Sequence, residues 1–511
     1  MDRASERPRW SKWVLLIAAA KLALHLAAIA TAYGVFRDEF YYLACARHLA
    51  WGYVDHPPLS IALLALDRAA FGEGLVALRW IPAVCGTATV LLAAALAREM
   101  GGASWAQVLA AIAALVAPVC IGVDSTYSMN VLEPLFWMGI ALALAKLING
   151  AGSRAWLAVG ALAGLGVLDK HSTAFFVVAF VAGALATPFR NRMRCKEFAL
   201  GIAIALALVA PHVVWQAAHG WPTLEFLRRA QATKNYLVSP LEFLRGQIES
   251  SHHLAFPLLV AGLLALLFAP RLRAYRSLGV GALLLIVFML LQHAKAYYVA
   301  PLYPLLFAAG AVFVEHWIAS TLTRAVAGAY IAILLATCAI LLPLATPLLA
   351  PEKYVEYAKR FGVETVQSER HEMGPLPQYY ADMHGWRELA HEVSLAYLSL
   401  PEAERAHCMV FAQNYGEAGA LEYFAREFPL PPACSGHNNY SLWGIPPGEI
   451  EVVIVIGGDR NEVLEAFAEV VDAGVHRSAW AMPYESDLAI RVCRVPQLPL
   501  AMLFQLTKHY D

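Results

Sequence analysis

Charged residues are scarce in this chain of 511 residues, since Asp, Glu, Lys and Arg supply 15% of it where about 25% is usual in soluble domains. The net charge of −1 argues against a nucleic-acid-binding protein, because phosphate backbones demand an excess of Lys and Arg. The chain also has no glycine fingerprint for dinucleotides at Gly457-Gly458 and no Cys/His metal spacing. What it has instead is hydrophobic residues, at 59%, which is typical of a membrane protein.

The eight cysteines are scattered, and those in or near apolar segments are expected to be small packing residues. Three fall in the polar tail, at Cys408, Cys434 and Cys493. One pair of these can be oxidised if the tail lies outside the cytoplasm.

Long apolar segments fill the first two thirds of the chain. A hydrocarbon core of roughly 30 Å needs about 20 apolar residues in a helix, and about eleven segments reach or approach that length. They are residues 13–33, 78–98, 105–122, 131–148, 155–169, 172–188, 198–215, 254–269, 278–293, 300–316 and 324–346. The first carries Lys21 and His25 and no small-residue cleavage site follows it, so we expect a retained span.

Basic residues predict the orientation through the positive-inside rule. They form three clusters, which are Arg3, Arg7, Arg9 and Lys12; Arg190, Arg192, Arg194 and Lys196; and Arg271, Arg273 and Arg276. All three fall on one side, the cytoplasm. The loops 34–77, 123–130 and 216–253 and the region around Lys295 then face outward.

The chain is predicted to divide into a membrane domain, 1–346, and a soluble extracytoplasmic domain, 347–511. Prolines punctuate the boundary and polar residues return after it. In the tail, 407–412 and 451–456 have strand length, and 417–427 and 461–473 have a helical pattern. The fold class is therefore a polytopic α-helical membrane protein with a small C-terminal α/β domain.

The first outward loop, 34–77, is more than a connector. Apolar and aromatic residues recur at helical spacing over 38–51 and again over 59–71. Two helices at the interface beneath a soluble cap would roof a cavity at the membrane surface.

The same loop carries the acidic pair Asp38-Glu39 and the turn Asp55-His56-Pro57-Pro58. An acidic pair at the mouth of a span is solvated, paired with a cation such as Arg37, or used in chemistry. Asp55 can cap the following helix after a turn that the prolines fix. His56 can also contact a phosphate or an acceptor.

Further ionisable residues interrupt the apolar segments. Glu133 begins a span, Asp169-Lys170-His171 separates two apolar runs, and Lys295 precedes Tyr297 and Tyr298 in QHAKAYYVAPLYP. A lysine near the outer leaflet either snorkels to the interface or binds a lipid phosphate. The tyrosines are either interfacial anchors or partners of the same phosphate or sugar.

The combination of RDEFYYLACARHLAWGYVDHPPL, LDKHSTAFF and KAYYVAPLYP along a hydrophobic chain resembles the bacterial branch of the protein mannosyltransferase superfamily, which includes the lipid A aminoarabinose transferases and the rhizobial galacturonosyltransferases. The likeness covers roughly residues 13–345. It implies the C-type membrane glycosyltransferase fold, a polyprenyl-phosphate sugar as donor, and inversion at the anomeric carbon.

The resemblance also implies site residues. The first-loop acid falls on Asp38, with Glu39 beside it, and these are the candidate catalytic residues. The candidate donor-phosphate and substrate-binding residues are Lys170, Lys295, Tyr298, His56, Asp55, Glu133 and His171. Asp38 would be the general base for a hydroxyl acceptor; for a phosphate acceptor it would orient groups or stabilise charge on the sugar ring.

Cations can stabilise a single leaving phosphate without a metal, and the chain has no DxD pair of the kind that holds a metal and a diphosphate. No cofactor is therefore predicted, although Glu39 or Glu133 with His56 could hold a divalent ion. The partners implied are a polyprenyl-phosphate sugar, a lipid, glycan or protein acceptor, and membrane lipids. The expected location is the bacterial inner membrane. Two alternatives stay open: a flippase or transporter of lipid-linked sugars, and a non-catalytic envelope assembly protein.

Overall fold

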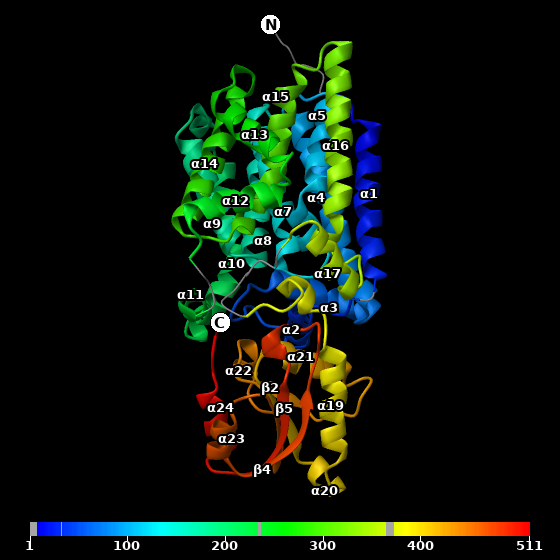
Figure 1. Cartoon of the computed structure of the whole chain (residues 1–511). Helices are drawn as coiled ribbons and strands as arrows, with labels where there is room; N and C mark the ends of the chain where they lie inside the picture. The colour runs from blue at the N-terminus through cyan, green and yellow to red at the C-terminus, as the bar shows by residue number, and fades with distance from the viewer. Residues whose placement is uncertain (1–7, 32, 234–236, 364–371, 511) are drawn as a thin grey trace.

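The computed structural model describes residues 8–31, 33–233, 237–363 and 372–510. Arg3 and Arg7 of the first basic cluster, and residue 32 of the first predicted span, lie outside the described residues. A helical bundle fills one end of the molecule and a sheet domain the other, with short helices between them (Figure 1). The predicted fold class is confirmed.

Each predicted apolar segment contains a helix of the bundle. The helices are α1 (Lys12–Ile29), α4 (Leu75–Glu99), α5 (Ser104–Val116), α7 (Glu133–Ile148), α8 (Ala155–Asp169), α9 (Ser172–Leu185), α10 (Lys196–Ala218), α13 (Phe256–Phe268), α14 (Arg276–Leu291), α15 (Tyr303–Glu315) and α16 (Thr321–Ala345). In the described part of the chain, seven helical stretches are long and apolar enough to cross a membrane, and α12 (Pro240–Ser251) with α13 forms an eighth that is bent by 109°. The helices α5, α8 and α9 are shorter but equally apolar.

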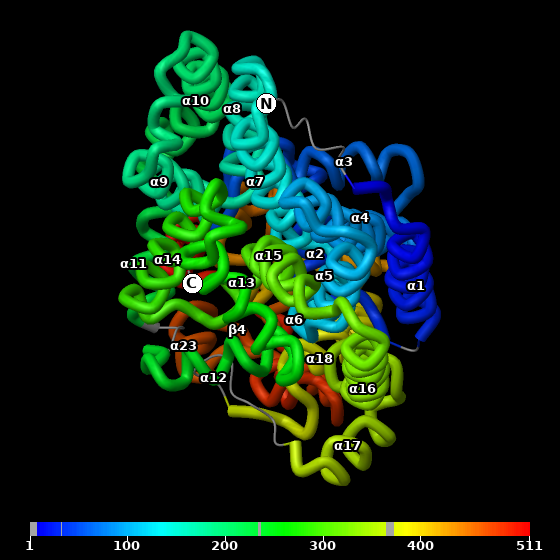
Figure 2. Tube along the Cα trace, turned by 90° about the horizontal axis from the view of Figure 1, so that it is seen from above, coloured from blue at the N-terminus to red at the C-terminus, as the bar shows by residue number. Residues whose placement is uncertain are grey.

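Glycines let several helix pairs approach closely. A Cβ at Gly262 of α13 would lie 1.9 Å from the carbonyl oxygen of Leu306 in α15, and a Cβ at Gly160 of α8 would lie 2.1 Å from the carbonyl oxygen of Gly201 in α10. Helices in lipid have no hydrophobic driving force between them, so they associate through close van der Waals packing, which small residues at the contact permit. Seen from above, α15 lies inside the bundle while α10 and α16 lie at its margin (Figure 2).

Contacts place the basic clusters at one end of the bundle. Arg98 binds the carbonyl oxygen of Pro8, and the hydroxyl of Tyr275 donates to the carbonyl oxygen of Glu99. The same hydroxyl also lies 2.6 Å from Oδ1 of Asn149 in the α7–α8 loop. At the start of α8, the indole of Trp156 donates to the carbonyl oxygen of Arg192. The predicted common side of the three clusters therefore agrees with the packing.

The opposite end is covered by the predicted roof. Its helices are α2 (Arg37–Arg47) and α3 (Leu59–Phe71), and α11 (Pro222–Thr233) and α17 (Pro351–Arg360) also lie toward this end (Figure 1). The roof shares a core with the sheet domain, since Phe40 packs edge-on against Trp386 and Tyr423 at centroid distances of 5.8 and 5.3 Å.

The sheet has the strand order β2-β1-β3-β5-β4. Its strands are β1 (Cys408–Ala412), β2 (Ala433–Ser435), β3 (Val452–Ile456), β4 (Phe467–His476) and β5 (Leu488–Pro496), with β1 parallel to β2 and β3, and β5 antiparallel to β3 and β4. Alternate strand residues face opposite cores. One face packs on α19 (Trp386–Leu398) and α21 (Tyr415–Phe424), and the other on α23 (Arg460–Ala466) and α24 (Leu500–Leu506).

One predicted element is wrong in part. The predicted helix 461–473 ends early, because α23 stops at Ala466 and residues from Phe467 onward form β4. Phe467, Val470 and Val471 have helical spacing, but pairing with β5 determines the structure there. All eight cysteines are free, including the three of the tail.

Candidate active site

Glu39 is fully buried at the start of α2 and is surrounded by donors. Its carboxylate accepts hydrogen bonds from Nε and Nη2 of Arg79 in α4, at 3.1 and 2.9 Å. The backbone N–H groups of Phe36 and Tyr127 also donate to it, each at 2.9 Å. Glu39 therefore fastens the roof helix to α4 and to the second outward loop, 123–130.

Asp38, the neighbouring acid, is partly exposed. The hydroxyl of Tyr415 donates to its Oδ1 at 2.9 Å. Tyr415 opens α21 of the sheet domain, so the predicted first-loop acid lies where the roof meets the tail. The two adjacent acids thus occupy different environments, one enclosed and one at an interface.

The Asp55-His56 turn lies against the same helix. The hydroxyl of Tyr41 donates to Asp55 at 2.8 Å. His56 is buried, with Nε2 at 3.8 Å from Oδ1 of Asp55 and its ring stacked on Tyr42 at 4.8 Å. The structure thus brings Asp55 and His56 to the helix that carries Asp38.

Tyr42 lies on the same helix as Asp38 and is stacked on His56. Its hydroxyl accepts a hydrogen bond from the backbone N–H of Met129 at 3.2 Å. Burial raises the pKa of this hydroxyl well above its usual range, and the negative charges of Asp55, Asp38 and Asp169 raise it further. Two acids of the first outward loop and the distant Asp169 therefore all raise the pKa of one phenol.

Lys170 and Glu133 form a buried ion pair. The ammonium Nζ is 2.7 Å from Oε2 of Glu133 and donates to Oδ1 of Asn130, also at 2.7 Å. The hydroxyl of Ser172 donates to the other oxygen of Glu133. Lys170 has extended backbone between α8 and α9, which turns its side chain into the cluster.

Two tyrosines of the motif QHAKAYYVAPLYP pack against the same lysine. Nζ of Lys170 lies over the rings of Tyr297 and Tyr298, at 5.8 and 5.3 Å from their centroids. These tyrosines belong to η4 (Ala296–Leu302), and Lys295 is the half-buried residue directly before it. Lys170, Glu133 and Tyr298, three of the predicted substrate-binding residues, therefore lie in one cluster.

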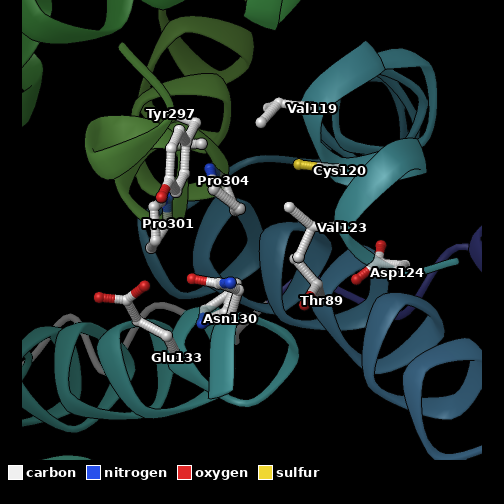
Figure 3. Close-up of a pocket in the computed structure, with 12 residues that line it drawn as sticks. Thr89, Val119, Cys120, Val123, Asp124, Asn130, Glu133, Tyr297, Pro301 and Pro304 are labelled. Carbon is white, nitrogen blue, oxygen red and sulfur yellow. The ribbon is translucent and has the colours of Figure 1, made fainter. Parts of the chain in front are cut away.

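A narrow cavity of about 20 Å³ lies beside this cluster. Glu133 and Asn130 lie on one wall, Tyr297 and two prolines on another, and Thr89, Cys120 and Asp124 face them (Figure 3). At the far wall Asp124 pairs with Lys21 of α1 at 2.9 Å. The cavity therefore lies between two buried ion pairs within a largely apolar lining.

His171 connects the lysine to the roof. Its Nε2 is 3.0 Å from Nε2 of His212 in α10, whose Nδ1 is 2.9 Å from the carbonyl oxygen of Trp51. His171 thus joins the first outward loop through His212. Among the described residues, no group of three or more His, Cys, Asp or Glu residues could hold a metal ion.

A pair of buried acids supports the interface from the sheet domain. Nδ2 of Asn414 donates to both Glu417 and Glu485, at 3.2 and 3.0 Å. Burial is the largest cause that raises the pKa of each carboxyl, and the charge of Glu417 raises that of Glu485 further. Nε of Arg37, the residue before Asp38, lies 3.8 Å from Glu485.

Several of these residues were not predicted from the sequence. The sequence could have indicated Asn130, because it lies one helical turn before the candidate residue Glu133. Arg79 had a weaker signal, as a cation near the start of a span. Tyr415 and the two tail acids had none, because only the tertiary fold brings the tail to the first loop.

Comparison with known proteins agrees with this architecture. Residues 55–215 match the model of the dolichyl-phosphate-mannose-protein mannosyltransferase family. No curated protein matches the sequence. The fold is similar to that of ArnT from Cupriavidus metallidurans bound to undecaprenyl phosphate, with 16% identity, a TM-score of 0.60, and coverage of 94% of this chain and 98% of that chain.

The apo state of the same ArnT matches with 15% identity and a TM-score of 0.61, over 94% of this chain and 97% of that chain. The arabinofuranosyltransferase AftD from mycobacteria matches with 16% identity and a TM-score of 0.54, over 96% of this chain and 40% of that chain. The family match and the shared fold confirm the predicted resemblance. The chain is a multi-pass membrane protein with the C-type glycosyltransferase fold, and its residues 55–215 resemble the protein mannosyltransferase family.

Proposed function

We propose that this glycosyltransferase moves a sugar from a polyprenyl-phosphate donor to an acceptor outside the cytoplasm, with inversion at the anomeric carbon. The proposal is supported by the family match and by the fold shared with ArnT, a protein bound to undecaprenyl phosphate. Its location would be the bacterial inner membrane, with the tail on the periplasmic side. The acceptor would be lipid A or lipopolysaccharide, another envelope glycan, or a protein.

One observation carries the proposal: a continuous path joins the buried lysine to the first-loop acid. Asn130 binds Lys170, and the preceding residue, Met129, donates its N–H to Tyr42 on the helix of Asp38. A phosphate at the lysine would therefore lie on the same rigid framework as the acid. Such fixed geometry is what a displacement reaction requires.

Lys170 is our candidate for the leaving phosphate. An ammonium has three N–H donors, and within the described residues Glu133 and Asn130 use two of them. The third would bind a phosphate oxygen and stabilise its charge as the bond to the sugar breaks. Lys295, Tyr298, His56, Asp55 and His171 remain proposed donor or substrate contacts around it.

Asp38 is our candidate for the acceptor side. With a hydroxyl acceptor, its carboxylate would remove the proton as the acceptor oxygen attacks the anomeric carbon and the phosphate leaves. With a phosphate acceptor no base is needed, and Asp38 would stabilise positive charge on the sugar ring. Because Glu39 is enclosed by donors, we propose that it positions Asp38 and does not react.

The predicted division into domains 1–346 and 347–511 is likewise a proposal. It is supported by the end of α16 at Ala345 and by the sheet that follows within the tail. The shared core between Phe40 and Trp386 means that the two domains would work as one body.

The test is sugar transfer from a polyprenyl-phosphate sugar in liposomes. Wild type is compared with Asp38→Asn and with Glu427→Gln, a control at an exposed ion pair with Arg387 in the sheet domain. We expect transfer by wild type and Glu427→Gln and at least a hundredfold loss in Asp38→Asn. Equal transfer by Asp38→Asn would remove Asp38 from the reaction, and movement of lipid-linked sugar without transfer would favour the flippase alternative.

A further inference from the structure

We infer that the sheet domain forms part of the transfer site, with Tyr415 and Asn439 as positioning residues that hold the carboxylates of Asp38 and Asp55. The inference rests on the proposed function and assigns a role to the tail. It is carried by two separate hydrogen-bonded links from the tail to the first outward loop.

The first link is direct. The hydroxyl of Tyr415 donates to Oδ1 of Asp38 at 2.9 Å. Its ring is fixed on three sides, by Tyr41 stacked at 4.5 Å, by the guanidinium of Arg37 at 4.9 Å and by His437 at 4.6 Å. A donor held so firmly selects one orientation of the carboxylate.

The second link passes through Tyr41. Nδ2 of Asn439, in α22 (Asn439–Trp443), donates to the hydroxyl of Tyr41, which in turn donates to Asp55 at 2.8 Å. Oδ1 of Asn439 accepts the backbone N–H of Val54 at 3.1 Å. One buried amide thus fixes both the backbone and the acid of the Asp55-His56 turn.

The two helices are shaped for this approach. A Cβ at Gly416 of α21 would lie 2.6 Å from Cγ of Arg37, and a Cβ at Gly419 would lie 2.9 Å from Cβ of Phe40. Larger residues at these positions would separate α21 from α2. The absence of side chains on this face therefore brings the Tyr415 hydroxyl within reach of Asp38.

A domain that served only to bind a partner would not need links to both Asp38 and Asp55. Here the tail donates a hydrogen bond to Asp38 directly and holds Asp55 through Tyr41. Because a proton transfer or a charge contact weakens sharply when the acid is misplaced, docking of the sheet domain would set the rate of transfer while leaving the donor at Lys170 unaffected.

The experiment uses the full-length chain in liposomes with a polyprenyl-phosphate sugar and compares wild type, Tyr415→Phe and Tyr397→Phe. Tyr415→Phe keeps the stacked ring and removes the hydroxyl. Tyr397→Phe is the matched control, because its hydroxyl donates to the carbonyl oxygen of Arg405 within the sheet domain. We expect kcat to fall about 5- to 10-fold in Tyr415→Phe, the loss typical of one hydrogen bond, with KM for the donor and the melting temperature unchanged.

With a hydroxyl acceptor the acid limb of the pH–rate profile should also move to higher pH, because the lost O–H favoured the ionised carboxylate. Arg37, Tyr41, Tyr42 and His437, which lie around the pair, are unchanged in the variant. Tyr41→Phe, which breaks the second link, should likewise lower kcat and not KM for the donor. It provides an independent test if Tyr415→Phe folds poorly.

The outcomes separate the inference from the function beneath it. Active wild type with Tyr415→Phe and Tyr41→Phe both equal to Tyr397→Phe would overturn the inference and leave the proposed function intact. A loss expressed as a raised KM for the donor would also overturn it. No transfer by wild type with any polyprenyl-phosphate sugar would contradict the proposed function, and the inference with it.

Discussion

Two adjacent acids, Asp38 and Glu39, show how little a residue type says about its role. Glu39 is fully buried and accepts four hydrogen bonds, so its carboxylate holds the fold together and is not accessible to a substrate. Asp38 is partly exposed and is held by a phenol from the tail. A buried ion pair that loses one partner leaves an uncompensated charge, at a cost of about 3–5 kcal/mol.

Glu39→Gln should therefore destabilise the protein by about 3–5 kcal/mol, because Arg79 would remain buried without its counter-charge. Asp38→Asn should change stability by no more than about 1 kcal/mol while abolishing transfer. Thermal unfolding in detergent and the transfer assay separate the two effects. Comparable melting temperatures for both variants would contradict the assignment of Glu39 to structure.

A second residue-scale prediction concerns Lys170. Lys170→Met leaves Glu133 buried and unpaired, so stability should fall by about 3–5 kcal/mol. Adding Glu133→Gln removes that charge and should restore most of the stability without restoring transfer, which should remain about 100-fold or more below wild type. Lys146→Met, at an exposed lysine of α7, is the control. Recovered transfer in the double variant would show that the lysine acts through structure alone.

At the scale of elements, glycine contacts determine how the helices pack. Gly262→Ala should destabilise the bundle by about 1–3 kcal/mol, because the new Cβ would lie 1.9 Å from a backbone oxygen of α15 that cannot move aside. Gly328→Ala in α16 has no atom within 4 Å of the new Cβ and should stabilise by up to about 1 kcal/mol. Melting temperatures of the two variants should thus shift in opposite directions, and equal shifts would contradict the packing argument.

The elements also show what the sequence could predict. Apolar length located each bundle helix, because the bilayer imposes it, and helical spacing located both roof helices in the first outward loop. The spacing of Phe467, Val470 and Val471 predicted a helix where β4 forms, since pairing with β5 is a tertiary effect. The family resemblance selected Lys170, Glu133 and Tyr298 as candidate substrate-binding residues, and the structure places them close together. Tyr415 could not be found without the docked tail.

At the scale of the whole molecule, the interface between roof and tail contains the acid pair Glu417 and Glu485. Their raised pKa values mean that the folded protein binds more protons than the unfolded chain. The contribution of this pair to stability should therefore be greatest below about pH 4.5 and fall as the pH rises through about 8, where the second carboxyl ionises. Melting temperature measured against pH should show this fall in wild type, and it should be nearly absent in Glu485→Gln. An equal slope in both would exclude the pair as its cause.

The last prediction concerns the orientation of the whole molecule in the membrane. The basic clusters lie at one end of the bundle and the sheet domain at the other (Figure 1), and the positive-inside rule predicts that the tail lies outside the cytoplasm. A membrane-impermeant maleimide added to intact spheroplasts should label Val471→Cys, on an exposed edge strand, and should label Arg194→Cys only after the membrane is permeabilised. Background labelling of the natural thiols is measured in wild type. Labelling of Arg194→Cys from outside would reverse the topology, and a donor site facing the cytoplasm would then contradict transfer at the outer surface.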